Sequence, residues 1–270
     1  TYLWTLTYVM EACVANGKPL VVLDRPNPTG AVRAMEEGPM LDEKKCSSFI
    51  GRWNIPLRHA CTLGELARHF QTTRLPDLAL TVIPVTNYER HFIGGKDFPF
   101  YPTSPAIRNA HTAMLYPGTG LWEGININEG RGTDKPFSQC GAPWMDGDQL
   151  TRILNEELTG LEAAPVTYTP TDSVYKGEIC RGISLRITSP DTFRPVRTGL
   201  QILKTILSLY SSHIQPRLYK TQANPGGDRH LDLLLGIPGA MEKIQRDDPE
   251  ALTAVPGNWI DERSLLYDSE

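Results

Sequence analysis

The chain opens with apolar side chains at the spacing of one helix face, namely Tyr2, Leu6, Val9, Met10 and Val14. Gly17 stands where a helix-ending glycine is common, and the apolar run "PLVVL" at 19–23 then predicts a buried strand. A helix that leads directly into such a strand is typical of the second half of a βαβ unit. We therefore expect the chain to begin inside an α/β domain, and to expose sheet edge and apolar surface that lower its solubility.

A second helix and a second strand follow in the same order. "TLGELARHF" places Thr62 and Glu65 at the T-x-x-E spacing of a capping box, which predicts a helix beginning there. "LALTVIPV" at 78–85 predicts another buried strand. Strands that alternate with helices favour a parallel sheet. We expect residues 1–137 to form the C-terminal portion of a Rossmann-like α/β domain.

The pattern changes near residue 138. "EICRGISLRIT" alternates, with one apolar face (Ile179, Ile183, Leu185, Ile187) and one mostly polar face (Cys180, Ser184, Arg186, Thr188). Such alternation is typical of a half-buried antiparallel strand. The longest helical pattern spans 196–210, and a shorter helix is predicted to begin at Asp146 or Asp148. The fold class is therefore α/β, an incomplete Rossmann-like domain followed by a smaller α+β domain over 138–270.

Composition narrows the classes of function. The net charge of −4 and pI of about 5.9 give no basic surplus, so nucleic acid is not an expected partner. No apolar run approaches the roughly 18 residues of a membrane span. The five cysteines are scattered without zinc-ligand spacing, which predicts free thiols and no metal. The G-x-S-x-G, P-loop, H-E-x-x-H and G-x-G-x-x-G motifs are absent, so no nucleotide cofactor is expected.

The stretch "EGININEGRGTDKPF" at 123–137 combines glycines with polar and charged side chains and has neither a helical nor a strand period. Carboxylates stand in this and other turns: Asp24, Glu37, Glu65, Glu123, Glu129 and Asp134. Paired carboxylates beside amides and an aromatic side chain are the usual equipment of glycoside hydrolysis. Three of them have a structural alternative: the capping box for Glu65, a pair with Arg131 or bonds to loop amides for Glu123, and an Asx turn for Asp24.

Seven segments, in this order, closely resemble the exo-β-N-acetylmuramidase family, glycoside hydrolase family 171: "VVLDRPNPTG", "EEGPMLD", "SSFIG", "IPLRHACTLGELA", "YPGTGLWEGININEGRGTDKPF", "GAPW" and "YKGEICRGISLRIT". The resemblance implies a Rossmann-like domain, a smaller C-terminal domain and a cleft between them. It implies release of N-acetylmuramic acid from the non-reducing end of peptidoglycan-derived muropeptides or disaccharides, with no metal or organic cofactor. It also implies a place outside the cytoplasm, extracellular or periplasmic, where that substrate lies.

The catalytic candidates are Glu123, Glu65 and His59, of which the resemblance places Glu123 and His59 in the cleft. The candidate substrate-binding residues are Asp24, Arg25, Asn27, Arg58, Ser104, Tyr116, Asn126, Arg131 and Thr133. Arginine binds carboxylates well, so Arg131 is expected to hold the lactyl carboxylate of the substrate.

This chain departs from the family pattern in three places. The family domain begins earlier, with further strands and a Pro-Glu-His-Gly motif that this chain lacks. Ala106 in "TSPAIRN" replaces a family asparagine, and "HACT" replaces His-Gly-Met-Thr. A non-catalytic protein that binds cell-wall sugars is therefore the alternative. An oxidoreductase is disfavoured because no glycine fingerprint is present.

Overall fold

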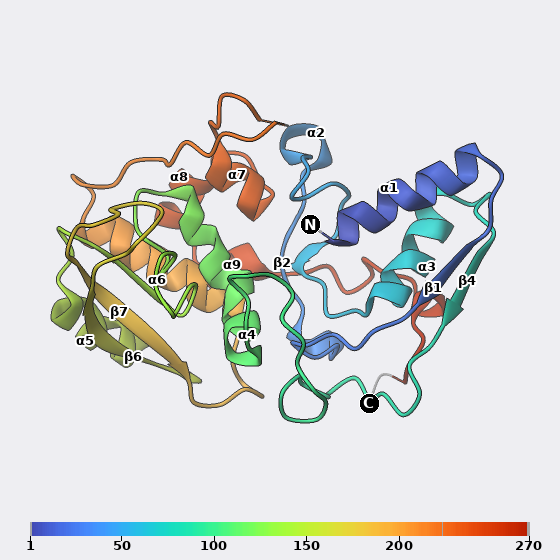
Figure 1. The fold of residues 1–270 in the computed structure, drawn as a ribbon, viewed down its shortest axis with the longest axis horizontal. Coiled ribbons are helices and arrows are strands. Elements are labelled where there is room, and N and C mark those ends of the chain that lie inside the picture. The colour runs from blue at the N-terminus through green and yellow to red at the C-terminus, as the bar shows by residue number, and fades with distance from the viewer. Residues whose placement is uncertain (1, 223, 269–270) are drawn as a thin grey trace.

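A computed structural model describes residues 2–222 and 224–268, which form two lobes joined by a narrower middle (Figure 1). The N-terminal lobe contains α1 (Tyr2–Ala15), β1 (Leu20–Leu23), α3 (Leu63–Arg74) and β4 (Leu80–Ile83). The strands β1 and β4 pair in parallel, with Leu20 opposite Leu80. The two helices pack around a core of Trp4, Met10, Leu66 and Phe70. The helix–strand order and parallel sheet predicted from the sequence are confirmed.

The two parallel strands are less buried than predicted. Val22 lies in the core, whereas Val21 is 59% exposed and Leu23 is 70% exposed. Ile83 of β4 is 48% exposed. The prediction of fully buried strands is therefore wrong for the described residues, because the helices cover one face of this sheet and leave apolar side chains on the other.

The middle of the molecule, which showed no regular pattern in the sequence, contains short elements. These are η1 (Arg33–Met35), β2 (Glu37–Met40), α2 (Glu43–Cys46) and β3 (Pro56–Arg58). β2 and β3 are antiparallel. Asp42 begins α2 by accepting hydrogen bonds from the amides of Lys44 and Lys45. Elements this short carry too few turns or alternations for a periodic signal.

The C-terminal lobe is an α+β unit. Its elements are α4 (Ala110–Thr119), η2 (Gly120–Gly124), β5 (Gln139–Ala142), α5 (Gly147–Glu157), β6 (Leu161–Tyr168), β7 (Cys180–Ile187), α6 (Pro195–Leu209), α7 (His230–Leu235), α8 (Ala240–Arg246) and α9 (Pro249–Thr253). The sheet is antiparallel in the order β5-β7-β6. The helix predicted from periodicity is α6, and its apolar stripe is fully buried. Asp146 is the N-cap residue of α5, which agrees with the first of the two predicted helix starts.

Two details of the sequence prediction change. Ile179 is 60% exposed and Cys180 is fully buried, so the predicted apolar and polar faces hold only from Ile183 onward. The lobes also meet earlier than the predicted boundary at 137/138. Leu115, Leu121 and Trp122 already belong to the C-terminal core, because α4 packs along α6.

The contact between α4 and α6 requires glycine on both helices. A Cβ atom on Gly118 would lie 1.9 Å from the carbonyl oxygen of Pro195. A Cβ atom on Gly199 would lie 2.5 Å from the Cα atom of Gly118. The close approach of these two backbones fixes α4 on the C-terminal lobe. It also fixes the segment at 123–137 that follows, which we call the signature loop.

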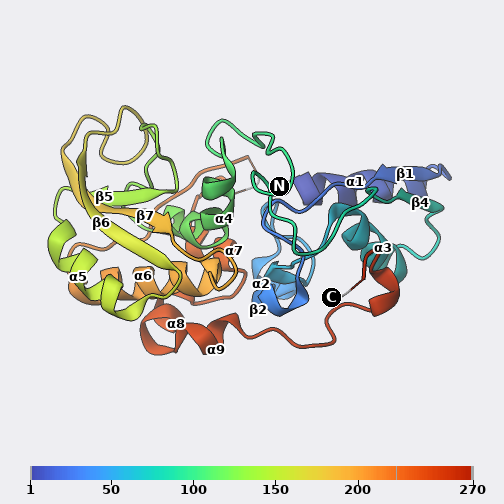
Figure 2. The same cartoon turned by 90° about the horizontal axis from the view of Figure 1, so that it is seen from below.

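The chain finally returns to the N-terminal lobe. After α9 it runs along the molecule toward α3 (Figure 2), where η3 (Glu262–Ser264) lies. The Leu266 amide donates to Glu65 Oε1 at 3.0 Å. The Tyr267 hydroxyl donates to Asp24 Oδ2 at 2.6 Å and accepts from the Val85 amide at 2.8 Å. This segment therefore closes the carboxyl ends of both parallel strands.

Candidate active site

The signature loop after η2 is held by its own side chains and glycines. Asn128 is fully buried, and its amide donates to the carbonyl oxygens of Arg131 at 3.2 Å and Val174 at 3.0 Å. Gly130 has a φ of +78°, and a Cβ atom there would lie 2.4 Å from the Lys135 carbonyl oxygen. Only glycine meets both conditions. The loop is therefore a rigid bend that presents Glu123, at its start, to Arg131.

Glu123 and Arg131 form the centre of the site. Glu123 Oε1 accepts from Arg131 Nε at 3.1 Å and from Arg131 Nη2 at 2.9 Å. The Glu123 side chain is 7% exposed and the Arg131 side chain 35% exposed. Among the described residues no donor reaches Glu123 Oε2. One carboxylate oxygen is thus fixed, while the other is left for a ligand.

Glu129 lies behind this pair and is fully buried. Its Oε1 is 3.1 Å from Arg131 Nε, and its Oε2 is 3.0 Å from Arg217 Nη1. The Ser173 hydroxyl accepts from Arg217 Nη2 at 3.1 Å. Arg131 Nε lies 3.1 Å from Glu123 Oε1 and also 3.1 Å from Glu129 Oε1, so it bridges the two carboxylates. Glu129 is neutralised on both sides, which makes it a support for Arg131 rather than a group that touches substrate.

Burial raises the pKa of Glu123 above its ordinary value, and the negative charge of Glu129 raises it further. The Arg131 guanidinium opposes both effects without cancelling them. Burial, with the nearby Glu123 charge, also raises the pKa of Tyr116 to about 12, so its hydroxyl stays a donor. Tyr116 packs edge-on against Phe137 with ring centroids 4.8 Å apart. The site therefore contains a carboxyl group shifted toward its protonated form beside a neutral phenol.

A second cluster lies at the carboxyl end of β1. Asp24 Oδ1 accepts from the Gly64 amide at 2.7 Å, and Asn27 Nδ2 donates to the Cys61 carbonyl at 3.0 Å. His59 Nδ1 accepts from the Cys61 amide at 3.2 Å. Asp24, Asn27 and His59 therefore meet around residues 59–64, as expected for a strand end. In the described part of the chain, no hydrogen bond or ion pair joins this cluster to Glu123.

Burial and the nearby Arg58 charge lower the pKa of His59 to about 4, so the folded protein holds it neutral at pH 7. An unfolded histidine titrates near 6.5. The stability from the neutral ring is present above that value and is lost as pH falls toward 4, because only the unfolded chain gains the proton. From pH 8 to pH 5 this effect should lower the free energy of unfolding of the wild type by about 2 kcal/mol. Glutamine at position 59 does not titrate, so His59→Gln should lack this part of the loss.

Denaturant unfolding of both proteins at pH 8 and pH 5 measures this difference. The variant His91→Gln serves as control, because His91 is exposed and its nearest charge is Glu89, 3.6 Å away. Equal pH slopes for the wild type and His59→Gln would show that the buried ring does not contribute.

Glu65 has a structural position. It is fully buried, forms an ion pair with Arg90, and accepts hydrogen bonds from the amides of Thr62 and Leu266. The predicted capping box is present. These bonds account for Glu65 without a substrate, so its predicted catalytic role receives no geometric support.

The remaining predicted residues are spread over the molecule. Arg58 is buried, pairs with Glu37 at 3.4 Å and donates to the Thr29 carbonyl at 3.0 Å. Asn126 brackets the 213–215 turn, donating to the His213 carbonyl and accepting from the Gln215 amide. The other three are Thr133, which donates to the Gly130 carbonyl, Ser104, which accepts from the Ile107 amide, and Arg25, which is exposed. Of the predicted residues, Tyr116 and the signature-loop residue Arg131 are the ones whose side chains lie beside Glu123.

Comparison with known proteins shows which family the chain belongs to. The family described as "Exo-beta-N-acetylmuramidase NamZ, C-terminal" matches residues 114–262, and the corresponding N-terminal family matches residues 1–111. The chain belongs to the NamZ family. The resemblance inferred from the sequence motifs is confirmed, and the junction of the two matches agrees with the change of core near α4.

Three known proteins that are similar to this chain are informative. The peptidoglycan beta-N-acetylmuramidase NamZ of Bacillus subtilis (strain 168) is 42% identical over 212 residues, which cover 78% of this chain and 50% of that protein. A DUF1343 family protein from Bacteroides fragilis has a TM-score of 0.80 and 26% identity, covering 92% of this chain and 64% of its own. A second from the same organism has a TM-score of 0.69 and 24% identity, covering 100% and 72%. The chain thus spans half the length of its curated relative, and the second structure supports the fold alone.

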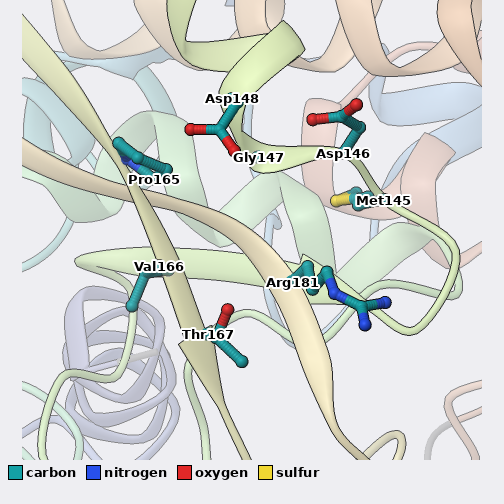
Figure 3. Close-up of a pocket in the computed structure, with 8 residues that line it drawn as sticks. All are labelled: Met145, Asp146, Gly147, Asp148, Pro165, Val166, Thr167 and Arg181. Carbon is teal, nitrogen blue, oxygen red and sulfur yellow. The ribbon is translucent and has the colours of Figure 1, made fainter.

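The chain has a hollow at the start of α5, with a volume of about 510 Å³. Figure 3 shows Asp146 and Asp148 on the α5 side and Thr167 and Arg181 on the strands. Asp146 already accepts from the Gln149 amide at 3.0 Å, which accounts for its position as a helix cap. This hollow contains no residue of the signature loop, so it is separate from the candidate site around Glu123.

Sequence reasoning missed Arg217, which lies far along the chain from the signature and carries no motif of its own. Its pairing with Glu129 depends on the turn after α6 folding back onto Gly124, whose carbonyl accepts from the Arg217 amide at 3.0 Å. Within the described ranges, no group of three or more His, Cys, Asp or Glu side chains is placed to hold a metal ion. No described helix is both long enough and apolar enough to cross a membrane.

Proposed function

We propose that this chain carries the acid/base site of a peptidoglycan exo-glycosidase that releases N-acetylmuramic acid from the non-reducing end of peptidoglycan fragments. The observation that carries the proposal is the buried Glu123, whose pKa is raised while one of its oxygens stays unbonded. A general acid for a glycosidic oxygen must hold a proton near neutral pH. The NamZ family membership supports the substrate class.

The groups around Glu123 suit this substrate. Arg131 uses Nε and Nη2 for the two glutamates, which leaves Nη1 without a bonding partner among the described residues. That atom is the proposed anchor for the lactyl carboxylate. Tyr116 is 40% exposed and offers a neutral hydroxyl to the sugar. Asn27 and His59, which are partly exposed, are the proposed second wall of the cleft. Asp24 supports this wall from behind, because both of its carboxylate oxygens are already hydrogen-bonded.

The same proposal extends to the place of action. Peptidoglycan lies outside the cytoplasmic membrane, so we expect the protein to be secreted or periplasmic and to serve cell-wall turnover. Muropeptides or the muramyl-glucosamine disaccharide are the proposed partners.

Incubating the full-length protein with N-acetylmuramyl-β-1,4-N-acetylglucosamine tests the proposal. Chromatography should detect free N-acetylmuramic acid and N-acetylglucosamine in equal amounts. Saturable binding of the disaccharide without either product would instead favour the non-catalytic sugar-binding alternative, which Ala106 supports.

A further inference from the structure

A second hollow lies beside the proposed active site, between the middle of the molecule and the C-terminal lobe. Residues 45–50 form one wall, and residues from 219–222 and 224–233 form the other. Its volume is about 750 Å³, within the range of about 300–1,000 Å³ that is typical of small-molecule sites. Arg229 ties the walls together, because its Nη2 donates to the Lys45 carbonyl at 3.1 Å. The hollow is thus closed by a contact between the middle of the molecule and the C-terminal lobe.

His230 lines this hollow and has an unused polar atom. The residue is 7% exposed, and its Nε2 is buried without a hydrogen-bond partner among the described residues. Its ring stacks on Tyr219, with centroids 4.4 Å apart and planes 8° from parallel. A buried polar nitrogen without a partner is unfavourable unless something else binds it. Burial lowers the pKa of His230 to about 4, so the ring is neutral and forms one bond there as donor or acceptor.

The other lining groups favour an uncharged ligand. Phe49 is 46% exposed and Ile50 is 38% exposed, which gives the first wall an apolar surface. Arg229 is committed to Asp232 and to the Lys45 carbonyl. The two other charged lining residues, Lys45 and Asp228, have opposite signs. The hollow thus combines apolar area, neutral hydrogen-bonding groups and no net charge.

Tyr219 connects the hollow with the proposed active site. The Arg217 guanidinium, which holds Glu129, lies 5.7 Å from the centre of the Tyr219 ring. Gly124, next to Glu123, has no room for a Cβ atom because Leu231 lies 2.6 Å away. One side chain, Arg217, therefore separates Glu129 from the Tyr219 wall of the hollow.

We propose that this hollow binds one uncharged N-acetylhexosamine ring, with a sugar hydroxyl hydrogen-bonded to His230 Nε2 and the N-acetyl methyl group against Phe49 and Ile50. A hydroxyl both donates and accepts, so it satisfies either tautomer of the ring. The choice of an amino sugar rests on the proposed function and makes the hollow the site of the sugar that follows the cleaved bond.

Binding of methyl β-N-acetylglucosaminide, followed by NMR shifts of backbone amides, tests this assignment. The shifts should saturate and map to residues 45–50 and to the described residues of the 219–233 wall. His230→Phe keeps the ring stacked on Tyr219 but removes the nitrogen, and should weaken binding at least tenfold. Phe49→Ser, on the other wall and partly exposed, should weaken it several-fold.

His213→Phe is the matched control. His213 also stacks on an aromatic ring, Trp144, at 5.4 Å and 10°, but does not line the hollow. This variant should bind as the wild type does. The inference fails if the sugar does not saturate the wild type, if the shifts map elsewhere, or if both His230→Phe and Phe49→Ser bind normally.

The proposed function is judged separately, by release of N-acetylmuramic acid and its dependence on Glu123. Release without sugar binding in the hollow would overturn the inference alone. Sugar binding in the hollow without release would overturn the proposed hydrolysis alone.

Discussion

Replacing Glu123 with glutamine should lower kcat for release of N-acetylmuramic acid by roughly 10²–10⁴-fold, the usual contribution of a general acid or base. Glutamine keeps the side-chain size and an oxygen that can accept from Arg131, but it has no proton to give to the leaving oxygen. KM for the disaccharide should change little, because the substitution leaves Arg131 and Tyr116 in place. Steady-state assays on the full-length protein measure both constants.

The pH profile separates this role from a structural one. Because burial and Glu129 raise the pKa of Glu123, wild-type activity should fall as pH rises through that raised value. Asp134→Asn is the control, since Asp134 is an exposed carboxylate of the same loop and should leave kcat unchanged. Normal kcat in Glu123→Gln would remove Glu123 from the mechanism.

Replacing Arg90 with methionine should destabilise the fold by about 3–5 kcal/mol, the usual effect of removing one partner of a buried ion pair. Both side chains of the Arg90–Glu65 pair are fully buried. Arg90 also donates to the carbonyl oxygens of Ala31 and Tyr267, so it joins the strand-end turn to the closing segment. Chemical denaturation should report the lower free energy of unfolding.

Arg186→Met provides the comparison, because the Arg186–Glu162 pair is exposed, with side chains 70% and 49% accessible. Exposed pairs contribute about 0–1 kcal/mol. The double variant Arg90→Met with Glu65→Leu should recover part of the loss, since no charge then stays buried alone. Similar losses for Arg90→Met and Arg186→Met would show that burial of the first pair does not matter.

Local signals in the sequence predicted much of the fold. The 3.6-residue period gave α1 and α6, and the T-x-x-E spacing gave the start of α3. The parallel pairing of β1 and β4 followed from the order of elements. These features depend on neighbours a few residues apart, which a sequence displays directly.

The exposure of the strands could not be read in the same way. "PLVVL" is apolar throughout, yet Val21 and Leu23 face outward. An apolar run indicates that burial of both faces of the strand would be favourable. Which face is in fact covered depends on where the helices pack. The boundary moved for a similar reason, since the glycine contact between α4 and α6 joins residues far apart in the chain.

The sequence by itself determined the family, the order of helices and strands, and the candidacy of Glu123 and Arg131, because these depend on residue type and short spacing. Only the tertiary structure decided which carboxylates are available. It committed Glu65 to Arg90 and Glu129 to two arginines, and left one oxygen of Glu123 unbonded. It also placed Tyr219 and His230 beside the site. The reason is that burial and charge pairing arise from contacts across the whole chain, so they exist only once it has folded.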